Sequence, residues 1–115
     1  MSVDYVRKID DISVVNTFSA EYTGEQTDVN IITPSSGKRI QVFSILLHGT
    51  ASSGTAALDF PTSGKKVARL YFTKAGQIYA SRMKILGGVN EPLRLNISGV
   101  NSSDQTFVLV NYREV

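Results

Sequence analysis

Hydrophobic and polar residues alternate with a period of two along much of the chain. In residues 93–97, LRLNI, the apolar side chains of Leu93, Leu95 and Ile97 share one side and polar side chains occupy the other. Such alternation is typical of a strand that is buried on one face of an antiparallel sheet. Residues 106–115, TFVLVNYREV, are rich in β-branched and aromatic side chains and predict a terminal strand. No stretch of about ten residues has the apolar spacing and caps of a surface helix.

Six further stretches have strand character, which brings the predicted total to about eight. They cover residues 12–22, 28–33, 39–49, 55–60, 65–74 and 76–86. Within 39–49, Ile40 and Val42 fall on one face, whereas Phe43 and Ile45 fall on the other. This strand is therefore either buried on both faces or interrupted by a bulge near Val42.

Turn-forming residues separate these stretches at regular intervals. We expect a compact connection of hairpin size at Ala75-Gly76 and a hairpin loop in GTASSGT, residues 49–55. Many short strands with evenly spaced turns are typical of a sandwich or a barrel. The predicted fold class is all-β, an antiparallel β-sandwich of about eight strands with a jelly-roll-like arrangement.

A six-residue motif occurs twice, as PSSGKR from Pro34 and as PTSGKK from Pro61. Its Ser-Gly-Lys core resembles the end of a phosphate-binding loop. However, the required earlier glycine is absent, no Ser or Thr follows the lysine, and a strand follows in place of a helix. A turn explains every position, because Pro fixes φ, Ser hydrogen-bonds to the backbone and Gly permits positive φ. We therefore predict two turns, each leading into a strand.

The length of 115 residues fits one domain with a single core. The chain has no cysteine, so disulfides and thiolate metal ligands are excluded. No apolar stretch approaches the roughly 20 residues of a membrane helix, and the start, MSVDYVRKIDD, lacks the apolar core of a secretion signal. We expect a soluble chain without a secretion signal and without membrane contact.

Charge is distributed unevenly although the net charge is only +2. Residues 1–28 contain six acids and two bases, whereas residues 65–84 contain six bases and no acid. Asymmetry of this kind can mark an interaction surface. It gives information about association rather than about the fold. Solvated faces of opposite sign are the simpler interpretation, and both stay open at this point.

Candidate catalytic and metal-binding residues are few. His48 is the single histidine, and it lies at the expected end of a strand without a second histidine or a cysteine. Asp10 and Asp11 form the one close pair of carboxylates, but adjacent residues of a strand point in opposite directions. No serine lies in a Gly-x-Ser-x-Gly elbow. We expect no enzyme activity, no cofactor and no metal site.

The basic segment 65–84 also contains Tyr71, Phe72 and Tyr79, a combination found in nucleic-acid-binding sheets. Alternation places Phe72 with Leu70 on the face expected to be buried, which favours a core role over a stacking platform. The chain as a whole also lacks the strong basicity of a non-specific nucleic-acid binder. Nucleic-acid binding through 65–84 therefore remains as an alternative function.

Several motifs resemble those of a known group of proteins. The succession NIITPSSGKRIQVFSILL, a small-residue loop, NEPLRLNISG and a final FVLVNYREV is similar to small β-sandwich domains in structural proteins of tailed bacteriophages and prophages. The resemblance covers residues 29–115. It implies a virion building block without catalytic residues, either a capsid-decorating protein or a tail or fibre accessory domain. A free-standing chain of this size fits decoration better, and the resemblance implies that such proteins are often trimers.

A tail or fibre appendage would instead bind a host glycan. Recognition of sugars would require an exposed aromatic platform, for which Tyr5, Tyr22 and Tyr79 are the candidates.

The hypothesis that follows is a capsid-decorating protein that works by protein-protein contacts. Residues 1–28 are expected to form an N-terminal arm or first strand that contacts another subunit, and residues 29–115 the β-sandwich. The expected partners are further copies of the chain, with a trimer as the predicted state, and a major capsid or other virion protein. The expected location is the virion, assembled in the host cytoplasm. The candidate interface residues are Asp4, Tyr5, Asp10, Asp11, Lys65, Lys66 and Arg69.

Overall fold

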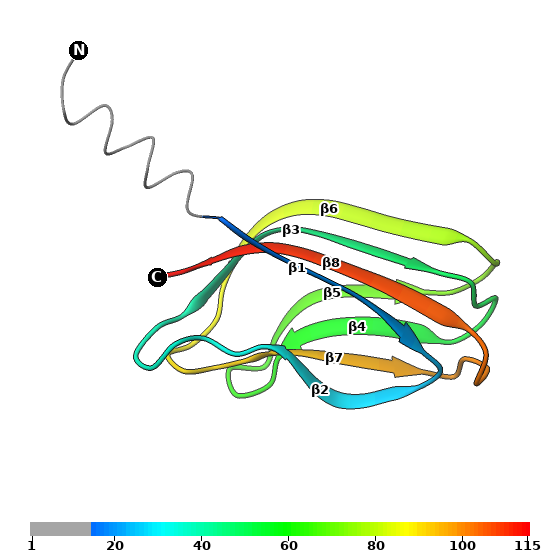
Figure 1. The fold of residues 1–115 in the computed structure, drawn as a ribbon, viewed down its shortest axis with the longest axis horizontal. Coiled ribbons are helices and arrows are strands. Elements are labelled where there is room, and N and C mark those ends of the chain that lie inside the picture. Colours follow the sequence, from blue (N-terminus) through cyan, green and yellow to red (C-terminus); the bar gives the residue numbers. More distant parts are fainter. Residues whose placement is uncertain (1–14) are drawn as a thin grey trace, which may run out of the picture.

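The structure is a computed structural model that describes residues 15–115. Eight strands follow one another along the chain: β1 Asn16–Thr23, β2 Gln26–Ile32, β3 Ile40–Gly49, β4 Thr55–Phe60, β5 Lys65–Tyr71, β6 Gln77–Leu86, β7 Leu93–Ser98 and β8 Gln105–Glu114. They form two four-stranded sheets, called sheet A, with the order β1-β8-β3-β6, and sheet B, with the order β2-β7-β4-β5. The two sheets lie face to face as layers (Figure 1). The prediction of an antiparallel, jelly-roll-like sandwich of about eight strands is confirmed.

The chain crosses between the two sheets at nearly every connection. The β4–β5 connection is the one that joins neighbours within a sheet, and the PTSG turn forms it. The connection at Ala75-Gly76 is compact, as predicted, but it does not form a hairpin, because it leads from β5 in sheet B to β6 in sheet A. The hairpin loop predicted in residues 49–55 is wrong for the same reason, since it joins β3 to β4. A short loop can bridge the roughly 10 Å between stacked sheets, so its length does not identify the partner strand.

The core lies between the sheets and is built from alternate residues of the inner strands. Leu93, Leu95 and Ile97 of β7 are buried, as their alternation predicts. The fully buried large side chains are Phe60, Ile40, Leu47, Leu58, Leu93, Leu95, Ile97, Val42, Val108 and Val110, joined by Thr106. Burial of this apolar surface is the main force holding the two sheets together.

Strict alternation would place the apolar residues of β3 on both faces of the strand. A bulge explains why residues from both sets are buried in one core. The pairing register shifts between Val42 and Ser44 on both sides of β3, against β6 and against β8. Ile40 and Val42 before the shift and Ile45 after it are all buried. An inserted residue changes the side on which the following side chains lie, so both halves of the strand contribute to one core. The bulge interpretation of residues 39–49 is confirmed.

Two aromatic rings pack directly on backbone at the ends of sheet A strands. A Cβ atom added to Gly49 would lie 2.5 Å from the ring of Phe72, and one added to Gly87 would lie 2.5 Å from the ring of Phe60. Both rings are buried. Glycine is therefore required at these two positions because a side chain would displace a core aromatic ring.

The two PxSGK motifs form turns, as their residue types predict. Gly37 and Gly64 have φ angles of 81° and 75°, and the Lys38 amide donates a hydrogen bond of 2.9 Å to the Ser35 carbonyl.

β1 lies within the predicted segment 1–28 and is a strand of sheet A. Residues 1–14 lie outside the described residues, so the predicted subunit contact of that segment stays a prediction. No helix in residues 15–115 is long and apolar enough to cross a membrane.

Substituting Gly37 by Val should lower the free energy of unfolding by about 1–3 kcal/mol, because a β-branched residue is strained at positive φ. No neighbour lies within 4 Å of the added Cβ, so the loss would come from backbone conformation alone. Lys38→Ser is the control and should change the free energy by less than about 0.5 kcal/mol, because only the backbone of this exposed residue is used in hydrogen bonds. Urea unfolding measures both, and equal losses would contradict the turn assignment.

Candidate functional site

The bases predicted to form an interface lie together on β5, an edge strand of sheet B. Lys65, Lys66 and Arg69 are all exposed. Lys65 Nζ donates a hydrogen bond of 2.7 Å to the carbonyl of Leu86, which ties the start of β5 to the end of β6 in the other sheet. The structure therefore presents the three bases at the open edge of the sandwich.

The acidic residues predicted to complete the interface cannot be placed beside these bases. Asp4, Tyr5, Asp10 and Asp11 lie outside the described residues. Their contact with β5 stays a prediction.

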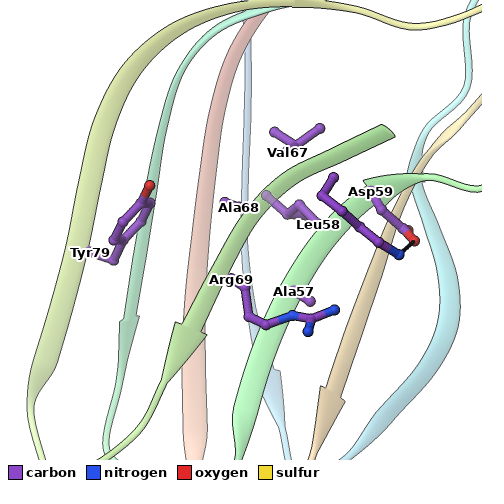
Figure 2. A pocket seen from close by; sticks show the side chains of 8 residues that line it. Ala57, Leu58, Asp59, Val67, Ala68, Arg69 and Tyr79 are labelled. Atoms are coloured by element: carbon purple, nitrogen blue, oxygen red, sulfur yellow. Dashed lines mark ion pairs between the residues drawn. The ribbon is translucent and has the colours of Figure 1, made fainter. Parts of the chain in front are cut away.

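A concavity of about 250 Å³ lies at the edge between β5 and β6. It is lined by Ala57, Leu58, Asp59, Lys66, Val67, Ala68, Arg69 and Tyr79. In Figure 2, Tyr79 stands on β6, whereas the side chains of Arg69 on β5 and Asp59 on β4 point away from it. Asp59 is paired with Lys66, whose Nζ lies 3.7 Å from its carboxylate, and Tyr79 lies apart from this pair (Figure 2).

An ion network crosses all four strands of sheet B. Arg94 of β7 donates from Nε and Nη2 to both carboxylate oxygens of Asp59 on β4, at 3.0 and 2.9 Å. Arg94 Nη1 also lies 3.4 Å from Asp28 of β2, and Lys66 Nζ of β5 lies 3.7 Å from Asp59. The hydrogen bond from Arg94 outweighs burial and lowers the pKa of Asp59. Asp59 is thus ionised near neutral pH, and both of its carboxylate oxygens accept hydrogen bonds from Arg94.

The turn of the second PxSGK motif holds a buried carboxylate. Glu91 is 3% exposed. The Ser63 amide donates to its Oε2 at 2.5 Å, while the Ser63 hydroxyl and the Gly88 amide donate to Oε1 at 2.9 and 2.8 Å. Burial alone would raise the pKa of Glu91, but the hydrogen bonds from Gly88, Ser63 and Thr62 lower it below its usual value. The motif does bind an anion, and that anion is a side chain of the same protein.

The first PxSGK motif is anchored in a similar way. The amide and hydroxyl of Ser35 both donate to the carboxylate of Glu114, near the end of β8. The Gly37 amide donates to Asn90 Oδ1 at 2.6 Å. These amide groups are already in use, so neither turn offers a phosphate a free set of donors. Neither Glu91 nor Asn90 could be singled out from the sequence, because each lies in a different segment from the turn that it contacts.

His48 lies at the end of β3 and is exposed, as expected of a histidine at a strand end. It lines a shallow concavity with Glu21 and Phe107. Within residues 15–115, no three His, Asp or Glu side chains are grouped so that they could hold a metal ion.

The aromatic residues of the basic segment do not form a stacking platform. Phe72 and Leu70 are buried, as their alternation predicts, and Tyr71 is exposed. Tyr22 and Tyr79 are only partly exposed and pack against the core. The described residues therefore lack a group of exposed tyrosines of the kind that glycan or nucleic-acid binding would use.

The outer face of sheet A is a feature that the sequence interpretation missed. Strand pairing places Ser19, Leu109, Leu46 and Ala80 in one row across the sheet, and Glu21, Phe107, His48 and Ile78 in the next. We call the apolar members the apolar face: Leu46, Ile78, Ala80, Phe107 and Leu109. In β3 and β8, the residues on both sides of the strand are apolar over part of its length. Alternation alone could not show which of these residues lie in the core and which lie on the surface.

The fold is shared with solved structures. A chain of the acidic stable capsid structure of Helicobacter pylori bacteriophage KHP30 is similar with a TM-score of 0.67 and 17% identity, over 90% of this chain and 94% of that chain. The PRD1 vertex protein P5 is similar with a TM-score of 0.53 and 10% identity, over 84% and 96%. The globular domain of zebrafish complement 1qA protein is similar with a TM-score of 0.51 and 7% identity, over 84% and 95%.

These likenesses concern the fold. No family model and no curated protein sequence matches the chain. The resemblance of the sequence motifs to small β-sandwich structural proteins of bacteriophages is confirmed at the level of the fold, over nearly the whole length of both chains in the capsid example.

Replacing Glu91 by Gln should lower the free energy of unfolding by about 2 kcal/mol, because an amide is isosteric but cannot accept hydrogen bonds at both positions. The matched control is Glu21→Gln on β1, where the side chain is exposed and a change below about 0.5 kcal/mol is expected. Urea unfolding at pH 7 measures both variants. If Glu91→Gln were as stable as the control, the carboxylate would not be what holds the PTSG turn.

Acid should destabilise the protein through Asp59 and Glu91. Both have lowered pKa values in the folded state, so their stabilisation is fully present above the unfolded carboxyl pKa of about 4 and is lost as the pH falls through the folded values. The free energy of unfolding measured from pH 7 to pH 2 should therefore fall below about pH 4. Asp59→Asn should reduce this dependence more than Glu21→Gln, and an unchanged slope would contradict the assignment.

Proposed function

We propose that the protein is a non-enzymatic structural component of a virion that decorates and cements a capsid. The observation that carries this proposal is the fold shared with a chain of a bacteriophage capsid structure over 90% of this chain and 94% of that one. The likeness to the PRD1 vertex protein supports it. The proposal is also supported by the state of two carboxylates that could otherwise take part in catalysis. Those of Asp59 and Glu91 are held by other groups within the fold.

Cementing works by mass action. A protein that contacts neighbouring capsid subunits only when they are assembled stabilises the assembled shell, because its binding free energy is absent from the separated subunits. In this proposal the protein is located in the virion, after assembly in the host cytoplasm, and its partners are a major capsid protein and further copies of itself in a trimer.

The proposed contact surface on the described residues is the basic edge formed by Lys65, Lys66 and Arg69. These side chains are exposed on an edge strand, where they can meet acidic groups of a capsid surface. The second part of the proposed interface is the acidic N-terminal segment with Asp4, Tyr5, Asp10 and Asp11. Neither part requires a cofactor.

The protein should sediment with assembled shells of the major capsid protein of the virion to which it is proposed to belong, and it should raise the temperature at which those shells break down. It should bind separated capsid subunits much more weakly, because the contacts would span neighbouring subunits. Centrifugation of labelled protein with shells or with subunits measures both. Absence of binding to shells at micromolar concentration would refute the decorating role.

The repeated motif supplies a matched pair of variants for the same measurement. Lys65→Ser with Lys66→Ser should weaken shell binding about tenfold at low salt, since two exposed ion pairs contribute roughly 1 kcal/mol or more together. Lys38→Ser with Arg39→Ser changes the equivalent positions of the first motif and should leave binding unchanged. Equal effects of the two double variants would show that net charge, and not the β5 edge, governs binding.

A further inference from the structure

The outer faces of the two sheets differ in chemistry. The charged groups on the outer face of sheet B pair with one another in the ion network around Asp59 and Arg94. The outer face of sheet A carries the apolar face, on which Ile78 is 62% exposed. Neighbouring rows join these apolar side chains into one patch, and a contiguous patch marks an interaction surface more often than isolated apolar residues do.

Four exposed side chains stand at the corners of this part of sheet A. One row of paired residues runs from Glu21 on β1 to Ile78 on β6, and another row, four residues along each strand, runs from Thr17 to Arg82. Strands about 4.8 Å apart and steps of about 3.4 Å per residue make this area a square with sides of about 14 Å. The acid Glu21 and the base Arg82 lie at opposite corners. The uncharged Ile78 and Thr17 occupy the other two.

This arrangement of charges is self-complementary. A two-fold axis that lies in the plane of the face, along the diagonal from Thr17 to Ile78, brings Glu21 of each copy opposite Arg82 of the other. The two corners on the axis meet their own equivalents, and neither of them carries a charge that would repel its copy. The strands of the two copies then cross at about 90°, which is one of the two preferred arrangements of packed sheets.

The shape of the face fits the same axis. A shallow hollow of about 340 Å³ lies between β3 and β6, with Leu46, Ala80 and Arg82 among the residues that line it. Rotation about the diagonal places Phe107 of the second copy over Ala80, at the rim of this hollow. A large ring thus meets a small side chain, and the symmetry produces this contact twice. Large and small side chains that alternate across two facing sheets pack without voids.

The polar side chains of the face already have partners in their own sheet. Thr17 Oγ1 donates to Asn111 Oδ1 at 2.6 Å, and Asn111 Nδ2 donates to Ser44 Oγ at 2.8 Å. A second copy that covers this row therefore leaves these hydrogen bonds in place, which avoids the cost of burying polar groups without partners.

Three further charged side chains lie on the strands of sheet A. Lys84 follows the basic corner on β6 and stands outside the square, where it approaches Glu21 of the other copy. Arg113 Nε donates to Gln41 Oε1 at 3.0 Å, so this base is engaged within its own chain. Glu114 accepts hydrogen bonds from the first PxSGK turn. These charges therefore do not oppose the two-fold arrangement.

We propose that the outer face of sheet A binds the same face of a second copy of this chain in a two-fold symmetric contact. The apolar faces of the two copies cover each other, and Glu21 pairs with Arg82 twice. Strands of 8 to 10 residues give the sheet a face of about 30 by 20 Å, which is below the roughly 800 Å² per partner of a standard interface. We therefore expect a dissociation constant in the micromolar range.

This contact goes beyond the proposed function and uses a different surface. The basic edge on β5 and the N-terminal segment take no part in it, so it joins two single chains, or two of the proposed trimers. Failure of the protein to bind capsid shells would leave this inference untouched, because the contact is between copies of the chain itself.

Exchange of charges between the corners tests the proposal. The mass of the full chain is measured by analytical ultracentrifugation above micromolar concentration and at pH 8, where an unperturbed histidine is neutral. Glu21→Arg alone and Arg82→Glu alone each place like charges opposite one another twice, so each should weaken the contact at least tenfold. An equal mixture of the two variants should associate again, since each chain then meets the opposite charge. The double variant should also associate.

Lys38→Glu is the matched control for Arg82→Glu. It changes the net charge by the same amount at an exposed position of the first PxSGK turn, outside sheet A. The mass of this variant should equal that of the unchanged chain. Recovery of association in the mixture also shows that both charge variants are folded.

Single cysteines test the position of the axis, since the natural chain has none. Facing sheets lie about 10 Å apart, which is too far for a disulfide, so a short bismaleimide is the suitable linker. Ile78→Cys lies on the axis and should be linked to its own equivalent. Thr23→Cys, exposed on β1 and away from the axis, should be linked much less.

Three results would overturn the proposal. The first is a mass that neither Glu21→Arg nor Arg82→Glu lowers relative to the unchanged chain. The second is a mixture of these two variants that associates no better than each variant alone. The third is equal linking of Ile78→Cys and Thr23→Cys.

Discussion

The buried carboxylate of Glu91 joins the segments at one end of the sandwich. It accepts hydrogen bonds from Ser63 in the β4–β5 turn and from Gly88 in the β6–β7 connection. The side chain of the neighbouring Asn90 accepts a hydrogen bond from the Gly37 amide in the first PxSGK turn. The backbone amide of Asn90 donates to the Lys38 carbonyl at 2.8 Å. The β6–β7 connection therefore lies between the two copies of the repeated motif and fixes both. A buried charge is tolerated here because both of its oxygens accept charge-assisted hydrogen bonds.

The positions of all eight strands could be predicted from the sequence, because alternation and turn residues are local signals. Which strands pair could not, since pairing depends on contacts between distant segments. The connection at residues 75–76 shows the limit: its glycine indicates a turn correctly, with a φ of 76°, yet the turn passes between sheets. The β3 bulge was one of two alternatives until the register was known.

The candidate site, too, could be predicted from the sequence only in part. Lys65, Lys66 and Arg69 lie together because one strand carries them, and sequence adjacency was sufficient to group them. The ion network of sheet B draws one residue from each of four strands, so no spacing in the sequence identifies it. The rows of the outer face of sheet A likewise combine residues from β8, β3 and β6. The outer face of sheet B thus carries charged groups that pair with one another, whereas the outer face of sheet A carries apolar groups in neighbouring rows.

The position of β8 has a consequence for the order in which the protein can be made. β8 is the last strand of the chain but lies inside sheet A, where it pairs with both β1 and β3 (Figure 1). β1 is the first strand described, and β8 is its partner in the sheet. During translation the early strand must therefore wait, unpaired, until residues 105–114 have left the ribosome. In sheet B only the β4–β5 hairpin can pair as soon as it is made, because β2 must wait for β7.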